Sequence, residues 1–100
     1  MSMEHRTLLT IVTEAALEHD LVREIERLGA NGYTVTDARG KGGRGVRNAG
    51  WNQIANIRID VVCTAQTARV IAAALRERYY DNYAMILFIG DVEVLRPEKF

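Results

Sequence analysis

The sequence contains few of the residues on which disulfide-rich proteins and most enzymes depend. Among its 100 residues there is one cysteine, Cys63, and the only histidines are His5 and His19. A single cysteine excludes an internal disulfide and favours a reducing compartment, so we expect a cytoplasmic protein with Cys63 as a buried free thiol. Ser2 is the only serine. These residues are too sparse for a nucleophile with its base or for a Cys/His metal set, so we expect no catalytic residue and no metal site.

The sequence also lacks an excess of charge and a long apolar run. Lys and Arg total 13, as do Asp and Glu, so the formal net charge is zero, which argues against a nucleic-acid-binding protein. Apolar runs such as residues 84–89 are far too short to cross a bilayer, and the first residues do not resemble a signal peptide. Apolar residues make up 48% of the chain, as expected for one folded domain over residues 1–100.

The most distinctive feature that is present is a basic, glycine-rich segment. Five of the eight glycines fall within residues 40–50, where four cations are interleaved with them: Arg39, Lys41, Arg44 and Arg47. No carboxylate occurs between Asp37 and Asp60. Glycine lets backbone N–H groups turn toward an anion, and guanidinium groups bind its oxygens in pairs. The pattern predicts a loop that binds phosphate or another small oxyanion, and the alternative is an exposed hairpin tip without a ligand.

Apolar periodicity predicts the order strand, helix, strand, loop, strand, helix, strand. We expect strands at residues 8–12, 33–36, 54–64 and 84–95, and helices at about 17–28 and 65–79. Gly29 suits the residue after the first helix, and Thr64 suits the N-cap of the second. Two successive βαβ units predict an α+β, ferredoxin-like βαββαβ sandwich, with both helices on one face of an antiparallel sheet.

The second face of such a sheet would have no helix to cover it. We expect this face to carry Leu9 or Val12, Val35, Val62 and part of the last strand, which together are too apolar to remain in water. Packing against further copies of the chain would cover these residues. The sequence therefore predicts a homo-oligomer.

Several motifs resemble the PII signalling proteins in their order and spacing. They are Thr13-Glu14, Gly29-Ala30-Asn31-Gly32-Tyr33-Thr34-Val35, Gly40-Lys41-Gly42, Arg44 with Arg47, and residues 81–87 with 93–95. The resemblance extends over residues 8–96. It is closest to the PII-like regulators that are associated with carboxysomes and with bicarbonate transporters.

The resemblance implies a non-enzymatic homotrimer that binds adenine nucleotides in the clefts between subunits. It implies a T-loop at about residues 39–53 and a B-loop at about residues 81–85. The implied nucleotide-binding residues are Val12, Thr34, Gly40, Lys41, Gly42, Arg44, Arg47, Val62, Ala84, Met85 and Arg96. The residues implied for bicarbonate are Lys41, Gly42, Gly43, Arg44 and Arg47.

Roles within this set also follow from the resemblance. Val12, Thr34 and Val62 match residues that line the adenine and ribose, whereas Arg44, Arg47 and Arg96, the last of them on the final strand, match arginines that reach the phosphates. The B-loop departs from the nitrogen-sensing members, because residues 83–86 read Tyr-Ala-Met-Ile where those proteins have Gly-Asp-Gly-Lys. Without that lysine, ADP, AMP or cyclic AMP is favoured over ATP.

We therefore expect a sensor of adenine nucleotide and bicarbonate whose T-loop is recognised by a carboxysome-related partner or a membrane transporter. One alternative is a regulator of a bicarbonate transporter that responds to nucleotide alone, for example to cyclic AMP. Another is a slow nucleotide hydrolase. Bicarbonate dependence separates the first alternative from the sensor, and turnover of bound nucleotide separates the second.

Overall fold

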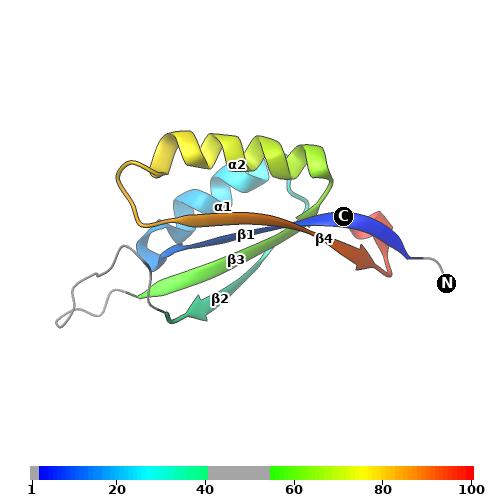
Figure 1. Cartoon of the computed structure of the whole chain (residues 1–100), viewed down its shortest axis with the longest axis horizontal. Coiled ribbons are helices and arrows are strands. Elements are labelled where there is room, and N and C mark those ends of the chain that lie inside the picture. The colour runs from blue at the N-terminus through cyan, green and yellow to red at the C-terminus, as the bar shows by residue number, and fades with distance from the viewer. Residues whose placement is uncertain (1–2, 41–54) are drawn as a thin grey trace.

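The computed structural model describes residues 3–40 and 55–100. The elements in these residues are β1 (Glu4–Glu14), α1 (Glu18–Arg27), β2 (Thr34–Ala38), β3 (Asn56–Cys63), α2 (Ala65–Tyr79) and β4 (Ile86–Val94) (Figure 1). Two short 3-10 helices, η1 (Ala15–Leu17) and η2 (Pro97–Lys99), precede α1 and follow β4. The predicted order of strands and helices is confirmed, although β1 extends beyond the expected residues 8–12 at both ends.

The strands form one antiparallel sheet in the order β2–β3–β1–β4. The central strand β1 pairs with β3 from Thr7↔Cys63 to Glu14↔Asn56, and with β4 from Glu4↔Val94 to Val12↔Ile86. Both helices lie on the same face of the sheet (Figure 1). This arrangement is the predicted α+β, ferredoxin-like sandwich.

The hydrophobic core lies between the helices and the face of the sheet that they cover. Along β3, Ile57, Ile59 and Val61 are buried, whereas Arg58 and Asp60 point to the opposite face and are more accessible. This alternation was predicted from the period of two in the sequence. The same cluster contains Leu9, Ile11, Leu21, Ile25, Ala68, Ile71, Leu75 and Tyr79.

Local signals in the sequence set the helix ends. α1 ends at Arg27, and Gly29 then adopts φ 114°, a left-handed conformation that glycine reaches without steric cost. Before α2, Thr64 Oγ1 accepts a hydrogen bond from the backbone N–H of Thr67 at 3.2 Å. Both predicted caps are confirmed.

A buried carboxylate joins the two helices. Glu24 on α1 binds Arg27 on the same helix at 2.8 Å and Arg78 on α2 at 3.5 Å. The hydrogen bond from Arg27 lowers the pKa of Glu24, desolvation opposes this effect, and the positive charges of Arg27 and Arg78 add to the lowering. Glu24 is therefore ionised at neutral pH and links α1 to α2 electrostatically.

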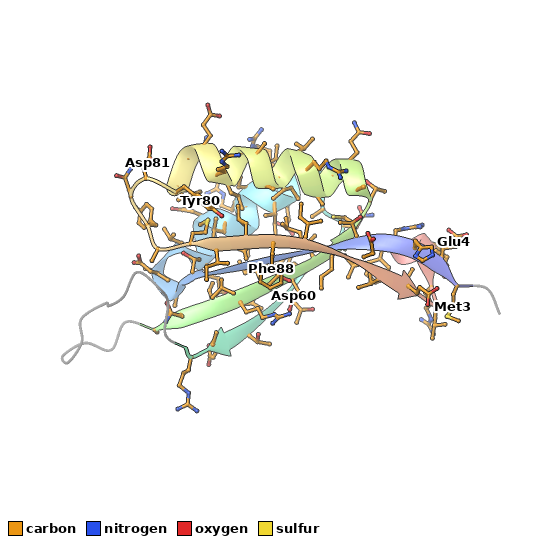
Figure 2. The ribbon with its side chains drawn as sticks, viewed as in Figure 1. Met3, Glu4, Asp60, Tyr80, Asp81 and Phe88 are labelled. Atoms are coloured by element: carbon orange, nitrogen blue, oxygen red, sulfur yellow. The ribbon has the colours of Figure 1, made fainter. Side chains whose placement is uncertain are left out.

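The second face of the sheet, which we call the open face, carries no helix in the described part of the chain (Figure 1). Leu8, Val12 and Val62 lie on this face and are partly buried. Ile86 and Phe88 on β4 also belong to it and are 52% and 47% exposed. Figure 2 shows Phe88 on the side of the sheet away from the helices. The prediction of an uncovered, partly apolar face is confirmed at Val12, at Val62 and along β4.

Two residues expected on the open face lie on the covered face instead. Leu9 is fully buried beneath the helices, so that of the two candidates on β1 only Val12 is open. Val35 pairs with Ile59, whose side chain points to the helices, and packs against the core. The prediction for Val35 was wrong because the orientation of β2 depends on its register with β3, and not on its own five residues.

Candidate functional site

The predicted residues near the T-loop and the B-loop lie at one end of the sheet, which we call the loop end. Gly40 follows the end of β2, and Ala55 precedes β3. The Ala55 carbonyl accepts a hydrogen bond from the Ala15 N–H at 2.8 Å, so the start of β3 is tied to the chain after β1. Thr13 Oγ1 donates to the Ala84 carbonyl at 3.2 Å and ties the predicted B-loop to β1. The backbone around the predicted loops is therefore fixed by β1.

Most of the predicted anion-binding residues lie outside the described residues. These are Lys41, Gly42, Gly43, Arg44 and Arg47. Their roles toward phosphate and bicarbonate stay predictions. Of the nucleotide-binding residues predicted in the T-loop, the structure describes Gly40, which is exposed.

The predicted B-loop is a tight turn that uses much of its own hydrogen-bonding capacity. The N–H groups of Asn82 and Tyr83 both donate to the Tyr79 carbonyl, at 3.1 and 3.0 Å. The Tyr83 ring packs edge-on against Tyr79 with the ring centroids 5.6 Å apart, and Met85 is buried. Two of the N–H groups in this turn are therefore already bonded to the last turn of α2, and the Ala84 carbonyl is bonded to Thr13.

The residues predicted to line the adenine and ribose share the open face. Thr34 begins β2 and lies directly across from Asp60 on β3, which lies across from Thr10 on β1. Val62 comes two residues after Asp60 on β3, and Val12 comes two residues after Thr10 on β1. Because these strands are antiparallel, Val62 and Val12 lie on opposite sides of the Thr10–Asp60 pair. Val12, Thr34 and Val62 therefore all lie on the uncovered side of the sheet, where one ligand can contact all three.

Between these three positions lies a polar network that we did not single out from the sequence. Thr10 Oγ1 donates to Asp60 Oδ1 at 2.7 Å, and Arg58 Nε donates to both carboxylate oxygens of Asp60 at 3.1 and 3.0 Å. Figure 2 shows Asp60 on the side of the sheet away from the helices. The available signal was the alternation of β3, which places Arg58 and Asp60 on the same face as Val62.

Arg96 lies at the opposite end of the sheet from the predicted loops. β4 ends at Val94, so Arg96 is not on the last strand as predicted, but caps η2 as its N-terminal flanking residue. Pro97 follows it and cannot donate a ladder hydrogen bond, which explains the earlier end of the strand. The nine residues of β4, at about 3.3 Å each, place Arg96 roughly 30 Å from the loop end. A single chain therefore does not bring Arg96 to the loops.

No catalytic constellation is found in residues 3–40 and 55–100. Asp60 and Asp91 pair with positions 10 and 7 of β1 and point to opposite faces of the sheet. His19 is exposed, and Cys63 is a buried free cysteine whose pKa is raised by desolvation. No three His, Cys, Asp or Glu side chains gather as metal ligands in this part of the chain, nor is any helix in it long and apolar enough to cross a membrane.

Comparison with known proteins identifies the family. A model of the family "Nitrogen regulatory protein P-II" matches residues 6–99. The chain belongs to the PII family. A solved PII-like signalling protein of Thermus thermophilus is 43% identical, with a TM-score of 0.85 over 100% of this chain and 99% of that one.

CPII of Thiomonas intermedia has the same fold at lower identity. Its structure with ADP, AMP and acetate is 22% identical, with a TM-score of 0.87 over 100% of this chain and 98% of that one. Its structure with ADP and bicarbonate is 23% identical, with a TM-score of 0.84 over 99% and 97% of the two chains. These likenesses confirm the PII fold.

In this PII protein the described candidate residues form separate groups. Gly40 lies beside the edge strand β2, and Ala84 and Met85 lie beside the opposite edge strand β4. β3 and β1 stand between these edges, so about 14 Å of sheet separates the two groups at strand spacings of about 4.8 Å. Together with the remote Arg96, this spread leaves one chain without an enclosed nucleotide pocket among its described residues.

Proposed function

We propose that the chain is a cytoplasmic, non-enzymatic PII-like regulator that binds an adenine nucleotide between the subunits of a homotrimer and senses bicarbonate through residues 39–53. The observation that carries this proposal is the division of the candidate residues between the open face and the two ends of the sheet. A ligand on the open face of one subunit would meet Arg96 only if another subunit supplies it. CPII, which shares the fold, was solved with ADP, AMP and bicarbonate.

Strand β4 supports assembly through the open face. It is an edge strand, and its large apolar residues are exposed on both sides of the sheet: Ile86 and Phe88 on the open side, and Ile89 (44% exposed) on the helix side. An uncovered edge strand of this kind is prone to pair or pack with another chain. Three-fold packing around β4 would bury these side chains and bring the far end of one subunit to the open face of the next.

The B-loop supports a ligand with fewer than three phosphates. It has neither the lysine nor the glycines of the nitrogen-sensing members, and the N–H groups of Asn82 and Tyr83 are already bonded to the last turn of α2. ADP and AMP are therefore the proposed ligands, ahead of cyclic AMP and ATP. The partner that recognises the T-loop would be a carboxysome-related protein or a bicarbonate transporter.

Calorimetric titration of the nucleotide at several bicarbonate concentrations tests this function directly. A nucleotide that orders the glycine-rich loop would lower the entropic cost of binding the small, well-hydrated bicarbonate ion. Each ligand should then tighten the other by about five-fold, which corresponds to a coupling free energy of ~1 kcal/mol. Chloride and acetate at equal ionic strength serve as controls.

Different outcomes separate the alternatives. A nucleotide dissociation constant that does not change with bicarbonate would favour the transporter regulator that senses nucleotide alone. Release of phosphate from bound nucleotide, assayed with and without Mg²⁺, would favour the hydrolase. Failure of ADP, AMP, cyclic AMP and ATP all to bind would refute the proposed function.

The phosphate assignment of the T-loop can be tested by Arg44→Ala and Arg47→Ala. A charge-assisted hydrogen bond is typically worth ~1.5–3 kcal/mol, so each change should weaken ADP binding roughly ten- to a hundred-fold. Arg23→Ala, at an exposed position on α1, is the matched control and should bind ADP like the parent. Unchanged ADP affinity in both loop variants would show that the phosphates are bound elsewhere.

A further inference from the structure

Arg6, near the start of β1, joins the two ends of the chain. Its Nη1 donates to the His5 carbonyl at 2.9 Å and to Glu4 Oε1 at 3.3 Å, and its Nη2 donates to the Pro97 carbonyl at 3.2 Å. Arg6 and Pro97 are 91 positions apart in the sequence. This part of the sheet projects past the ends of the helices (Figure 1), and Figure 2 shows Glu4 in the same region. The guanidinium of Arg6 thus ties the segment after β4 to β1.

The Pro97 carbonyl accepts two hydrogen bonds and so connects that segment to β1 and to η2. Besides Nη2 of Arg6, it accepts the Phe100 N–H at 3.1 Å, which closes η2. The pairing of β1 with β4 ends at Glu4↔Val94, and Pro97 has no N–H with which to extend it. A segment at this position tends to fray unless a contact holds it. The contact with Arg6 supplies that support just beyond the end of the ladder.

Arg96 stands between these two fixed points. Val94 on one side is held in the sheet, and Pro97 on the other is held by Arg6. The side chain of Arg96 is exposed and makes no ion pair with any residue that the structure describes. Its guanidinium is therefore free to bind a ligand, while its main chain is already ordered.

Arg6 itself is poorly suited to contact a phosphate. Its side chain is only 21% exposed, both terminal nitrogens already donate hydrogen bonds, and Nε is buried without a partner among the described residues. Its neighbour Glu4 also places a carboxylate beside the guanidinium, which would repel a phosphate. Any effect of Arg6 on a phosphorylated ligand must then be transmitted through the segment that it holds.

We propose that Arg6 is a positioning residue for Arg96. By holding the Pro97 carbonyl, Arg6 fixes the main chain of Arg96, so that its guanidinium meets the nucleotide phosphates on the open face of a neighbouring subunit. This inference rests on the proposed function, in which the site takes Arg96 from another subunit. The ordering of residues 95–97 before binding lowers the entropic cost of the phosphate contact.

A comparison of ADP with adenosine tests this role, because adenosine has no phosphate. Arg6→Met keeps the apolar stem but removes the hydrogen bond to Pro97. It should weaken ADP binding by about five- to ten-fold, less than the roughly ten- to a hundred-fold expected when a charge-assisted bond to the phosphate is lost outright, because Arg96 itself is still present. Arg96→Gln should do the same or more. Adenosine affinity should not change in either variant. The double variant should bind ADP no more weakly than Arg96→Gln alone, since Arg6 acts through Arg96.

Two further variants control for charge and for folding. Glu4→Gln removes the negative charge beside Arg6 but leaves the bond to the Pro97 carbonyl, so its ADP affinity should match the parent. Arg6→Lys keeps the charge and can still donate to Pro97, so it should bind ADP with an affinity between those of the parent and Arg6→Met. In the ligand-free protein, the Phe100 amide should exchange hydrogen faster in Arg6→Met than in the parent, because the junction at Pro97 is loosened. If Arg6→Met does not fold, Arg6→Lys carries both measurements.

The outcomes that would overturn the inference are distinct from a failure of the proposed function. If ADP binds the parent and Arg96→Gln weakens it, but Arg6→Met does not, the positioning role is wrong and the function stands. An equal loss of ADP and adenosine affinity in Arg6→Met would indicate a purely structural role and would also overturn it. Unchanged ADP affinity in Arg96→Gln would remove Arg96 from the site, and the inference with it. If the parent binds no adenine nucleotide, the proposed function and this inference are both wrong.

Discussion

The covered face and the open face of the sheet are built from alternate residues of the same strands, but they differ in what surrounds them. On β3, Ile57 and Ile59 are buried beneath α1 and α2 within a single chain. On β4, Ile86 and Phe88 are about half exposed although they are equally apolar. The covered face thus stabilises the single chain, whereas the apolar part of the open face is available to stabilise an assembly.

The open face is also divided across its width, unlike the covered face. Its β1–β4 side is apolar at Val12, Ile86 and Phe88, and its β3 side carries the ion pair of Arg58 with Asp60. Subunit packing favours the apolar side, whereas a ribose or phosphate favours the polar one. A face built in this way can serve assembly and ligand binding at the same time.

The largest expected effect of a single substitution is on the covered face. Ile59→Ala removes a fully buried side chain from the core and should lower the free energy of unfolding by about 2–5 kcal/mol, since the cavity adds to the lost transfer free energy. Ile59→Val is the matched control and should cost about 0.5–1.5 kcal/mol. Urea unfolding followed by circular dichroism measures both. A cost for Ile59→Ala no greater than that for Ile59→Val would contradict this account of the core.

The open face should respond differently, with loss of assembly instead of loss of fold. Phe88→Glu places a charge in the proposed subunit interface, so light scattering at micromolar concentration should change from about three chain masses to one. Far-ultraviolet circular dichroism should stay that of the parent, and ADP binding should be lost. Val70→Glu is the control, because Val70 is similarly exposed (44%) but lies on α2. If the parent protein is itself a stable monomer, the proposed subunit interface on the open face is wrong.

Removal of a hydrogen bond on the open face should have a smaller effect. Thr10→Val keeps the shape of the side chain but removes the donor to Asp60, whose carboxylate retains Arg58. The expected cost is about 1–3 kcal/mol of unfolding free energy, because the Thr10 site is fully buried and one carboxylate oxygen loses a partner. Thr36→Val, at an exposed position on β2, should be close to neutral. Equal effects of the two changes would show that the bond to Asp60 is not stabilising.

The sequence sufficed for features that depend on local pattern. The order of elements, the cap residues Gly29 and Thr64 and the alternation of β3 were predicted correctly, because each is set by residues close in sequence. The face of the sheet to which Val35 belongs was not predicted correctly. β2 carries one large apolar residue, so its orientation is set by its pairing with β3. The early end of β4 was missed as well. For Val35 the deciding contact is made with a distant part of the chain, whereas β4 ends early because Pro97 lies close behind it in the sequence.

In the candidate site, too, some features follow from local sequence pattern and others depend on contacts between distant residues. The resemblance to PII proteins placed Val12, Thr34 and Val62 in one set, and strand alternation explains how these positions come to share the open face. Their role toward the adenine and ribose stays a prediction. The tie between Arg6 and Pro97 joins residues 91 positions apart, and no local pattern indicates such a contact. The roles of residues 41–54 stay predictions that binding experiments must test.

The smallest expected effect concerns the helix layer above the covered face, and it depends on pH. Because Arg27 lowers the pKa of Glu24 in the folded protein, the ionised carboxylate stabilises the fold above the ordinary glutamate pKa of about 4.3. This contribution is lost as the pH falls through the lower folded-state pKa. Glu24→Gln should therefore have a lower melting temperature than the parent at pH 7, and the difference should shrink as the pH falls below about 4. Glu26→Gln, at an exposed position on the same helix, should follow the parent at every pH. A melting-temperature difference for Glu24→Gln that stays constant from pH 7 to pH 3 would mean that packing at this position, and not the ion pairs with Arg27 and Arg78, joins the two helices.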